Sequence, residues 1–213
     1  MDAEVFRAWI VSAAGVIETN RDHLTQLDAA IGDADHGINL ARGFTAVLGA
    51  LDAPGAKTAT PGAILTVTGN TLISKVGGAS GPLYGMAFRR AGQALGDAAD
   101  VDLPALSAAL DAALAGVQQL GAAREGDKTM VDALAAATRA FSKAIAEGAS
   151  PDHALGSLAE AAEAGAAATV SMQALKGRAS YLGPRSVGHE DPGAASTALI
   201  LGALRDVAAR RGR

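Results

Sequence analysis

The sequence predicts an all-α protein, a bundle or barrel of about eight helices. Hydrophobic residues make up 49% of the chain but aromatic residues only 3%, so small aliphatic side chains must fill the interior and let helices pack closely. Apolar residues recur at intervals of three and four, the period of a helix with one buried face. Proline follows a capping side chain at several positions, which marks helix starts, whereas no segment shows strand signals.

The first four helices are predicted from this periodicity and from proline. The apolar face of an N-terminal helix consists of Val5, Trp9, Ala13 and Val16. A second helix is expected to begin near His36, with an apolar face made of Leu40, Phe44 and Val47. Thr60-Pro61 caps and starts a third, and Pro82 starts a fourth that ends near Leu95.

The next two helices follow the same signals. Pro104 lies near the start of a helix that ends around Gly121. We expect Asp127 to cap the helix that follows. The apolar face of that helix consists of Met130, Leu134, Phe141 and Ile145.

Two further cap-plus-proline pairs complete the count. Ser150-Pro151 opens a long alanine-rich helix to about Lys176, and Asp191-Pro192 begins the C-terminal helix. The apolar faces continue across the surface loops between these segments. We therefore expect a single domain over residues 1–213.

Charge and composition exclude several classes of protein. The net charge of −4 is spread evenly and forms no basic stripe, so we expect no nucleic-acid partner. The chain has no cysteine, which removes disulfides and thiolate metal sites and suits a reducing compartment. We find no signal peptide, and no apolar run approaches the ~18 residues of a membrane span. A cytoplasmic protein without a membrane partner is expected.

The segment DAAIGDADHG, residues 28–37, concentrates acidic side chains in an otherwise apolar sequence. The three aspartates are Asp28, Asp33 and Asp35. Their spacing cannot place all three on one helical face, and it suits a loop that curls back. Clustered carboxylates suit Mg²⁺ or Ca²⁺, and a cation would keep them ionised. An EF-hand is excluded because Ile38 and Phe44 stand where its glycine and glutamate would be. The alternative is that these aspartates only form turns and caps.

Two connections contain more glycine and proline than a tight turn needs. GGASGPLYG, residues 77–85, places Ser80 before a helix start, where unpaired N–H groups favour phosphate; the alternative is a flexible connector. In the loop 177–193, Arg178 and Arg185 could clamp phosphate oxygens, or its charges could merely face solvent. Together with the aspartates, these features indicate a metal–nucleotide site.

Four motifs, in this order, resemble the ADP-binding L-subunit family of dihydroxyacetone kinases, the DhaL family. They are LDAAIGDADHGIN (27–39), GGASGPLYG (77–85), GDKTMVDAL (126–134) and GRASYLGPRSVGHEDPGAAST (177–197). The resemblance covers almost the whole chain. It implies an antiparallel barrel of eight amphipathic helices that binds the nucleotide at one open end.

The resemblance implies a role for each matched residue. Two Mg²⁺ ions that bridge the phosphates of ADP or ATP would be held by Asp28, Asp33 and Asp35. The nucleotide would be bound by His36, Gly37, Ile38, Asn39, Ala79, Ser80, Gly121, Met130, Arg178, Asp191, Pro192 and Gly193. Gly121 and Met130 would border the adenine. Catalysis by Arg178, Asp33 and Asp35 would be positional and electrostatic.

The implied activity is that of a phosphotransferase subunit, a phosphoenolpyruvate–glycerone phosphotransferase. ADP would stay bound, be rephosphorylated by the phosphohistidine of a phosphotransferase-system M subunit, and pass phosphate to dihydroxyacetone on a separate K subunit. One alternative keeps the chemistry but lets ATP exchange freely, with dihydroxyacetone or a related ketose as substrate. Another is a non-catalytic, nucleotide-dependent regulatory module. The oligomeric state, a homodimer included, stays open.

Overall fold

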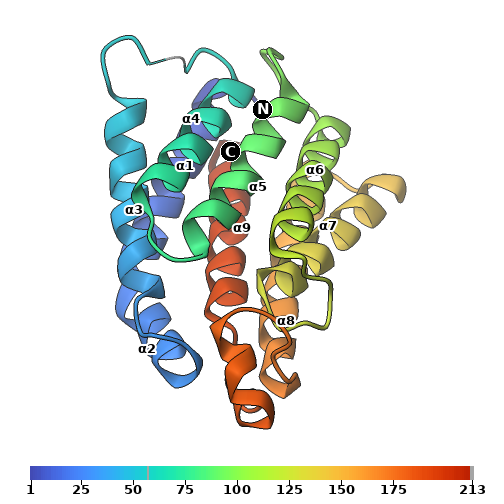
Figure 1. Ribbon diagram of the computed structural model, residues 1–213. Coiled ribbons are helices and arrows are strands. Elements are labelled where there is room, and N and C mark those ends of the chain that lie inside the picture. Colours follow the sequence, from blue (N-terminus) through green and yellow to red (C-terminus); the bar gives the residue numbers. More distant parts are fainter. Residues whose placement is uncertain (57, 212–213) are drawn as a thin grey trace.

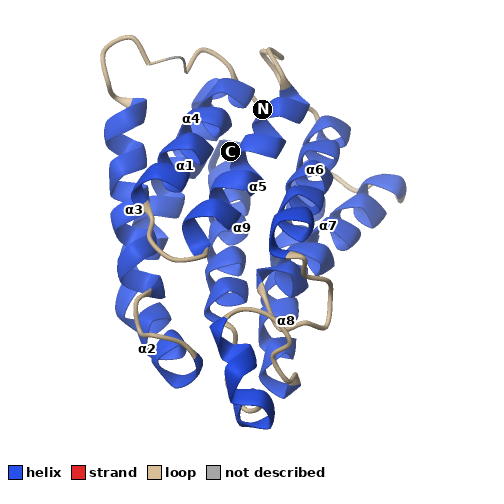
Figure 2. Ribbon diagram, in the orientation of Figure 1, coloured by secondary structure: helices blue, strands red, loops and turns tan. Residues whose placement is uncertain are grey.

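A computed structural model gives the structure of residues 1–56 and 58–211, which fold entirely into helices and loops (Figures 1 and 2). Lys57 and residues 212–213 of the predicted domain lie outside this described part. The α-helices are α1 (Ala3–Thr19), α2 (Arg21–Ile31), α3 (His36–Leu51), α4 (Pro61–Lys75), α5 (Ser80–Leu95), α6 (Leu103–Gly121), α7 (Met130–Ala146), α8 (Pro151–Ala168) and α9 (Pro192–Arg211). Two 3₁₀ helices, η1 (Thr169–Ser171) and η2 (Arg178–Ser186), separate α8 from α9. The predicted all-α class is confirmed.

Eight of these helices form a closed ring. Each packs on the next in the order α1, α3, α4, α5, α6, α7, α8, α9, and α9 returns to α1. Neighbours run in opposite directions (Figure 1), as in the antiparallel barrel that the resemblance implies. The short helix α2 lies outside this count, at one end of the ring between α1 and α3. None of the described helices is long and apolar enough to cross a bilayer.

Helix α9 differs from the expected amphipathic pattern. It packs against α1, α7 and α8 and is buried around most of its circumference, more completely than an amphipathic helix with one exposed face (Figure 1). Trp9 on α1 donates its indole N–H to the Ile200 carbonyl of α9 over 2.8 Å. Trp9 also contacts Phe6 and Phe88 at ring-centroid distances of 5.9 and 5.8 Å, and Phe44 lies 6.3 Å from Phe88. These four aromatic rings form one contiguous cluster within a core that is mainly aliphatic.

Several element boundaries differ from the sequence prediction. The sequence pattern did not predict α2 as a separate helix. It is separate because α1 ends at Asn20, whose side chain donates to the Val16 carbonyl over 2.8 Å. Helix α5 begins at Ser80 rather than Pro82, since proline is tolerated in the first turn, where an N–H has no helical partner.

The N-terminal cap of α7 and the C-terminal end of α8 also differ from the sequence prediction. Asp127 does not cap α7: its carboxylate accepts the Arg124 N–H over 2.9 Å, and Thr129 is the cap, paired with Asp132 in a capping box. Helix α8 ends at Ala168 instead of Lys176. The reason is that buried Thr169 bonds through its hydroxyl and its carbonyl to other segments, which draws the chain out of the helix.

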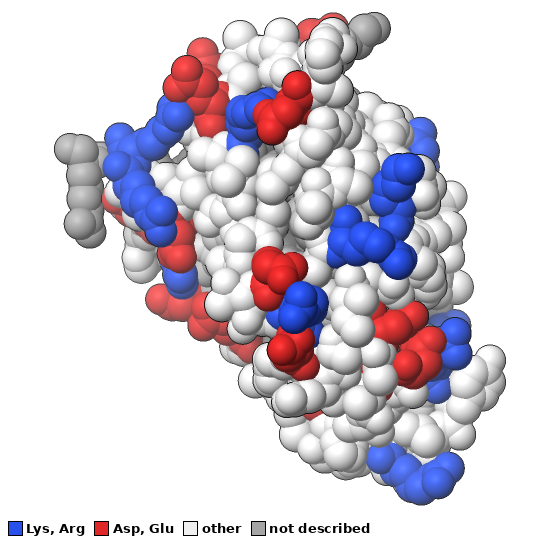
Figure 3. Space-filling model, turned by 90° about the vertical axis from the view of Figure 1, so that its left-hand side faces the viewer, with Lys and Arg blue, Asp and Glu red and all other residues white. Residues whose placement is uncertain are grey.

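Opposite charges are intermixed on the surface. Figure 3 shows a face where basic side chains lie beside acidic ones instead of forming one large patch. Ion pairs of this exposed kind join Arg7 to Asp52 and, at 3.0 Å, Arg21 to Glu18. Because each such pair contributes at most about 1 kcal/mol, the stability of the barrel depends on its core.

Glycines bring the backbones of α4 and α5 into direct contact. A Cβ atom on Gly69 of α4 would lie 2.6 Å from the Gly85 carbonyl oxygen of α5, and one on Gly92 would lie 2.6 Å from the Gly62 carbonyl oxygen. Both distances are shorter than a van der Waals contact, so no side chain fits between these helices. The contact therefore fixes α5, and with it the glycine loop at residues 77–79.

Substituting Gly69 by alanine should destabilise the protein. The new methyl group would meet backbone atoms of Gly85 and Arg89 at 2.6 and 2.8 Å, so α4 and α5 must separate at a cost of about 1–3 kcal/mol. Gly49→Ala is the matched control, because Gly49 lies on the exposed face of α3 with nothing within 4 Å. That change should stabilise by up to about 1 kcal/mol. Urea unfolding of both variants measures the difference, and equal stabilities would contradict the packing.

Candidate functional site

A cavity of about 280 Å³ opens at the end of the barrel where four helices begin. Its wall includes the first residues of α3, α5, α7 and α9, which are His36, Ser80, Met130 and Pro192. Helix N-termini carry unpaired N–H groups and the positive end of the helix dipole. Four of them around one cavity favour an anionic ligand.

Among these four helix starts, that of α5 differs: in the described structure, no side chain accepts a hydrogen bond from its N–H groups. Asp28 accepts from the start of α3, Thr129 caps α7, and Asp191 accepts the Ala194 N–H of α9 over 2.7 Å. At α5, the preceding residue Ala79 provides no such acceptor, and the Ser80 hydroxyl donates to a carbonyl instead. The glycine loop therefore presents free donors to the cavity.

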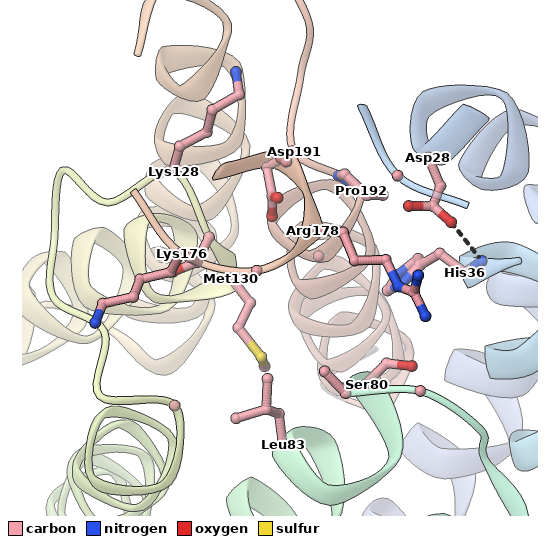
Figure 4. Close-up of a pocket in the computed structure, with 18 of the residues that line it drawn as sticks. Asp28, His36, Ser80, Leu83, Lys128, Met130, Lys176, Arg178, Asp191 and Pro192 are labelled. Carbon is pink, nitrogen blue, oxygen red and sulfur yellow. Dashed lines mark hydrogen bonds between the residues drawn. The ribbon is translucent and has the colours of Figure 1, made fainter. Parts of the chain in front are cut away.

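The three aspartates come together as the sequence spacing predicts. One carboxylate oxygen of each lies within 4.8 Å of the others; the residues are Asp28, Asp33 and Asp35. Asp28 belongs to the last turn of α2, and its Oδ2 accepts the N–H groups of Asp35 and His36 over 2.8 and 3.1 Å (Figure 4). Gly32 allows this loop, because a Cβ atom there would collide with the Asp28 carboxylate.

Charge repulsion makes the acidic cluster unfavourable by itself. At these distances, two carboxylates repel by roughly 3–4 kcal/mol at an effective dielectric near 20. Arg178 supplies one positive charge, with its Nη2 3.1 Å from Asp33 Oδ2. One guanidinium does not offset three carboxylates. Hard, closely spaced oxygens of this kind match the donor preference of Mg²⁺, so the residues fit a divalent metal site.

A buried hydrogen-bond network joins the starts of three helices beneath the cavity. The Nε2 atom of His36 (α3) lies 2.8 Å from Ser196 Oγ (α9), and the Tyr84 hydroxyl (α5) lies 2.7 Å from the same oxygen. Tyr84 also bonds to the Gly193 carbonyl over 2.9 Å. Burial lowers the pKa of His36 and raises that of Tyr84, so both side chains are neutral near neutral pH. The network fixes these helix ends relative to one another.

Asp191 combines a capping role with an unusual protonation equilibrium. Its Oδ2 accepts the Ala194 N–H, as a cap of α9. Removal from water raises the pKa of Asp191 to about 7, although that hydrogen bond and the charge of Lys128 act in the opposite direction. This carboxyl group, on the wall of the cavity, therefore changes its charge near neutral pH.

The cavity wall contains most, but not all, of the predicted site residues. Those on the wall are Asp28, Asp33, Asp35, His36, Ala79, Ser80, Gly121, Met130, Arg178, Asp191, Pro192 and Gly193. Three residues of the first turns of α3 are not. Gly37 packs against the Arg21 carbonyl of α2, Ile38 is 51% exposed, and Asn39 accepts a hydrogen bond from Arg42 over 2.9 Å.

Sequence reasoning missed several residues of the wall. Leu83 and Val117 are two of them; with the predicted Met130, whose side chain points toward Leu83 (Figure 4), they give the cavity an apolar side. Lys128 and Lys176 also belong to the wall. Lys128 lies in the quoted motif GDKTMVDAL, but a lysine in a polar loop gives no sequence signal that distinguishes it from a surface residue.

Known proteins resemble this chain over most of its length. A family model described as DAK2 domain matches residues 30–206. PEP-dependent dihydroxyacetone kinase, ADP-binding subunit DhaL, from Escherichia coli (strain K12) is 42% identical over 193 residues, 91% of each chain. Triokinase/FMN cyclase from Rattus norvegicus is 41% identical over 87% of this chain and 32% of that protein. The crystal structure of the C. freundii dihydroxyacetone kinase in complex with AMP-PNP and Mg²⁺ matches with a TM-score of 0.69 and 28% identity, over 97% of this chain and 34% of that one.

Replacing Asp191 by asparagine should remove a pH dependence of stability. In the folded protein its pKa is about 7, against an ordinary value of 3.8, so the folded state retains this proton more strongly. The free energy of unfolding should therefore fall between about pH 4 and pH 7, by on the order of 2–4 kcal/mol from this group. Asp191→Asn keeps an acceptor for Ala194 but does not titrate. Urea unfolding of nucleotide-free protein at about pH 5 and about pH 8 tests this; a constant difference between variant and wild type would contradict it.

Proposed function

The chain belongs to the DAK2 domain family, and from that premise we propose that it is the ADP-binding subunit of a dihydroxyacetone kinase. It would carry a nucleotide with Mg²⁺ and transfer the terminal phosphoryl group to dihydroxyacetone held on a separate K subunit. The observation that carries the proposal is the meeting of three carboxylates, a free helix N-terminus and an arginine at one cavity.

Each part of the cavity has a chemical task in this reaction. Asp28, Asp33 and Asp35 would hold two Mg²⁺ ions, which neutralise phosphate charge when bound. The N–H groups at Ala79 and Ser80 would orient phosphate oxygens, because they have no side-chain partner. The apolar side that contains Leu83 and Met130 would accept the base.

Arg178 is proposed to stabilise charge on the phosphoryl group as it moves. Its guanidinium is 67% exposed and already lies beside Asp33, so it can reach a ligand bound to the acidic cluster. Phosphoryl transfer of this kind depends on positioning and electrostatic stabilisation. His36 is neutral and bonded to Ser196, which suits a role in fixing the site rather than in accepting a proton.

The phosphoryl donor defines the proposal further. The Escherichia coli relative is named a PEP-dependent subunit, which supports rephosphorylation of bound ADP by a phosphotransferase-system M subunit, in the cytoplasm. The Rattus norvegicus relative, named triokinase/FMN cyclase, is almost equally similar. That similarity supports the alternative in which ATP exchanges freely and a ketose is phosphorylated directly. A non-catalytic, nucleotide-dependent regulatory module is the third possibility.

Nucleotide retention separates these functions. Freshly purified protein with Mg²⁺ should keep ADP through desalting and, with K and M subunits and phosphoenolpyruvate, should form dihydroxyacetone phosphate. Loss of nucleotide on dialysis, together with ATP turnover in the presence of a K subunit alone, would instead indicate the ATP-dependent kinase. Nucleotide binding without a sugar phosphate in any reconstitution would indicate the regulatory module.

The metal assignment is tested by removing charge from the cluster. Asp33→Asn and Asp35→Asn should each lower Mg²⁺-dependent ADP affinity and transfer by at least about 100-fold, because a metal ligand is lost. Asp97→Asn, at an exposed loop position, is the control and should have no effect. Calorimetric titration of ADP with and without Mg²⁺ measures the affinity. Transfer at the wild-type rate in both cluster variants would show that the metal lies elsewhere.

A further inference from the structure

Lys128 is the most deeply buried charged side chain of the described residues, at 1% exposure. Its Nζ donates to the Thr169 carbonyl over 2.5 Å and to the His189 carbonyl. Figure 4 shows the ammonium pointing away from Met130 and from the centre of the cavity. Burial of an ammonium is unfavourable unless hydrogen bonds compensate, so these carbonyl groups determine where Lys128 lies.

The two carbonyl groups belong to opposite ends of one segment. We call residues 169–191, between α8 and α9, the lid. Thr169 is its first residue and His189 is near its last, so a single ammonium joins both ends. Two further bonds close the same neck: the Gly188 N–H donates to Val170 over 2.7 Å, and the Asp191 N–H donates to Thr169 Oγ1 over 2.9 Å.

Beyond this neck, few polar contacts hold the lid: the Leu175 N–H donates to the Asp127 carbonyl over 3.1 Å, and Arg178 pairs with Asp33. Its apolar contacts form a small cluster separate from the main core, made of Ile31, Ala174, Ala179 and Leu182. Large apolar side chains of the lid remain exposed, with Tyr181 at 88% and Leu175 at 53%. Segments with few buried apolar contacts open locally at low free energy. The closed neck therefore has a large share in holding the lid, which carries Arg178 at the start of η2.

The backbone at Lys128 is strained, which indicates that contacts of its side chain compensate for this conformation. Lys128 has φ of +61°, in the left-handed region, where a residue with a Cβ atom costs about 1–2 kcal/mol. This conformation directs the side chain inward between the lid ends. Glycine would adopt the same backbone without strain but could not supply the ammonium.

We propose that Lys128 is a positioning residue for phosphoryl transfer: its ammonium joins both ends of the lid and so holds Arg178 over the acidic cluster. The role of Arg178 rests on the proposed function, whereas the anchoring of the lid does not. Although Lys128 belongs to the cavity wall, its ammonium would touch neither nucleotide nor substrate. Its effect would pass through the Thr169 and His189 carbonyl groups to the lid backbone.

Hydrogen exchange of the nucleotide-free protein tests the anchor directly. Lys128→Met keeps the aliphatic length and removes the N–H donors. Lys128→Gly also removes the donors but relieves the backbone strain, so it is the second variant in case Lys128→Met does not fold. Both should speed exchange in peptides covering residues 170–190 by at least about tenfold, with α1 and α4 unchanged. Lys143→Met, an exposed lysine of α7, should leave exchange as in the wild type. Unchanged exchange in folded Lys128 variants would overturn the proposal.

A double-mutant cycle with Arg178 tests the positioning role. Lys128→Met should lower kcat and Mg²⁺-dependent ADP affinity by about tenfold or more, yet change either less than about twofold in an Arg178→Ala background. Equal effects in both backgrounds would mean a general structural role and would overturn the proposal. The cycle can also be measured by ADP affinity alone. It therefore still tests the positioning role of Lys128 if the protein binds nucleotide but transfers no phosphate. That result would count against the proposed function alone.

Discussion

The alternation of helix direction around the closed ring is the constraint on which the candidate site depends. Because neighbours are antiparallel, every second helix begins at the same end, and α3, α5, α7 and α9 direct their N-termini at one cavity. Their dipoles create a positive potential there, in addition to the charges of Lys128, Lys176 and Arg178 on the cavity wall. The acidic cluster then lies beside that potential, so one end of the barrel offers both cation ligands and anion donors.

The residues at the helix starts determine which part of this end offers cation ligands and which offers anion donors. Asp28 and Asp191 each cap a helix and also face the cavity, which links the geometry of the site to the stability of α3 and α9. Helix α5 keeps its N–H groups free because glycine and alanine precede it. The contact of Gly69 with Gly85 holds α5 against α4, and the free donors thus rest on a rigid part of the barrel.

Much of this architecture could be predicted from the sequence, for identifiable reasons. Cap-plus-proline pairs such as Thr60-Pro61 and Ser150-Pro151 are local signals, and the structure has helix starts at both. The end of α8 was not predictable, because Thr169 leaves the helix to meet partners far along the chain. The gathering of three aspartates followed from their spacing. Lys128 did not, since burial of a lysine is decided by tertiary contacts that a single sequence does not reveal.

The closing position of α9 in the ring has a consequence for biosynthesis. The ribosome makes α9 after every other helix of the ring, yet α9 closes the ring and meets α1 across 191 residues, at Trp9 and Ile200. Until α9 emerges, the apolar surfaces of α1, α7 and α8 that pack against it stay uncovered. Such long-range closure is slow and leaves a nascent chain open to aggregation, so this fold depends on shielding during translation more than a bundle of successive hairpins would.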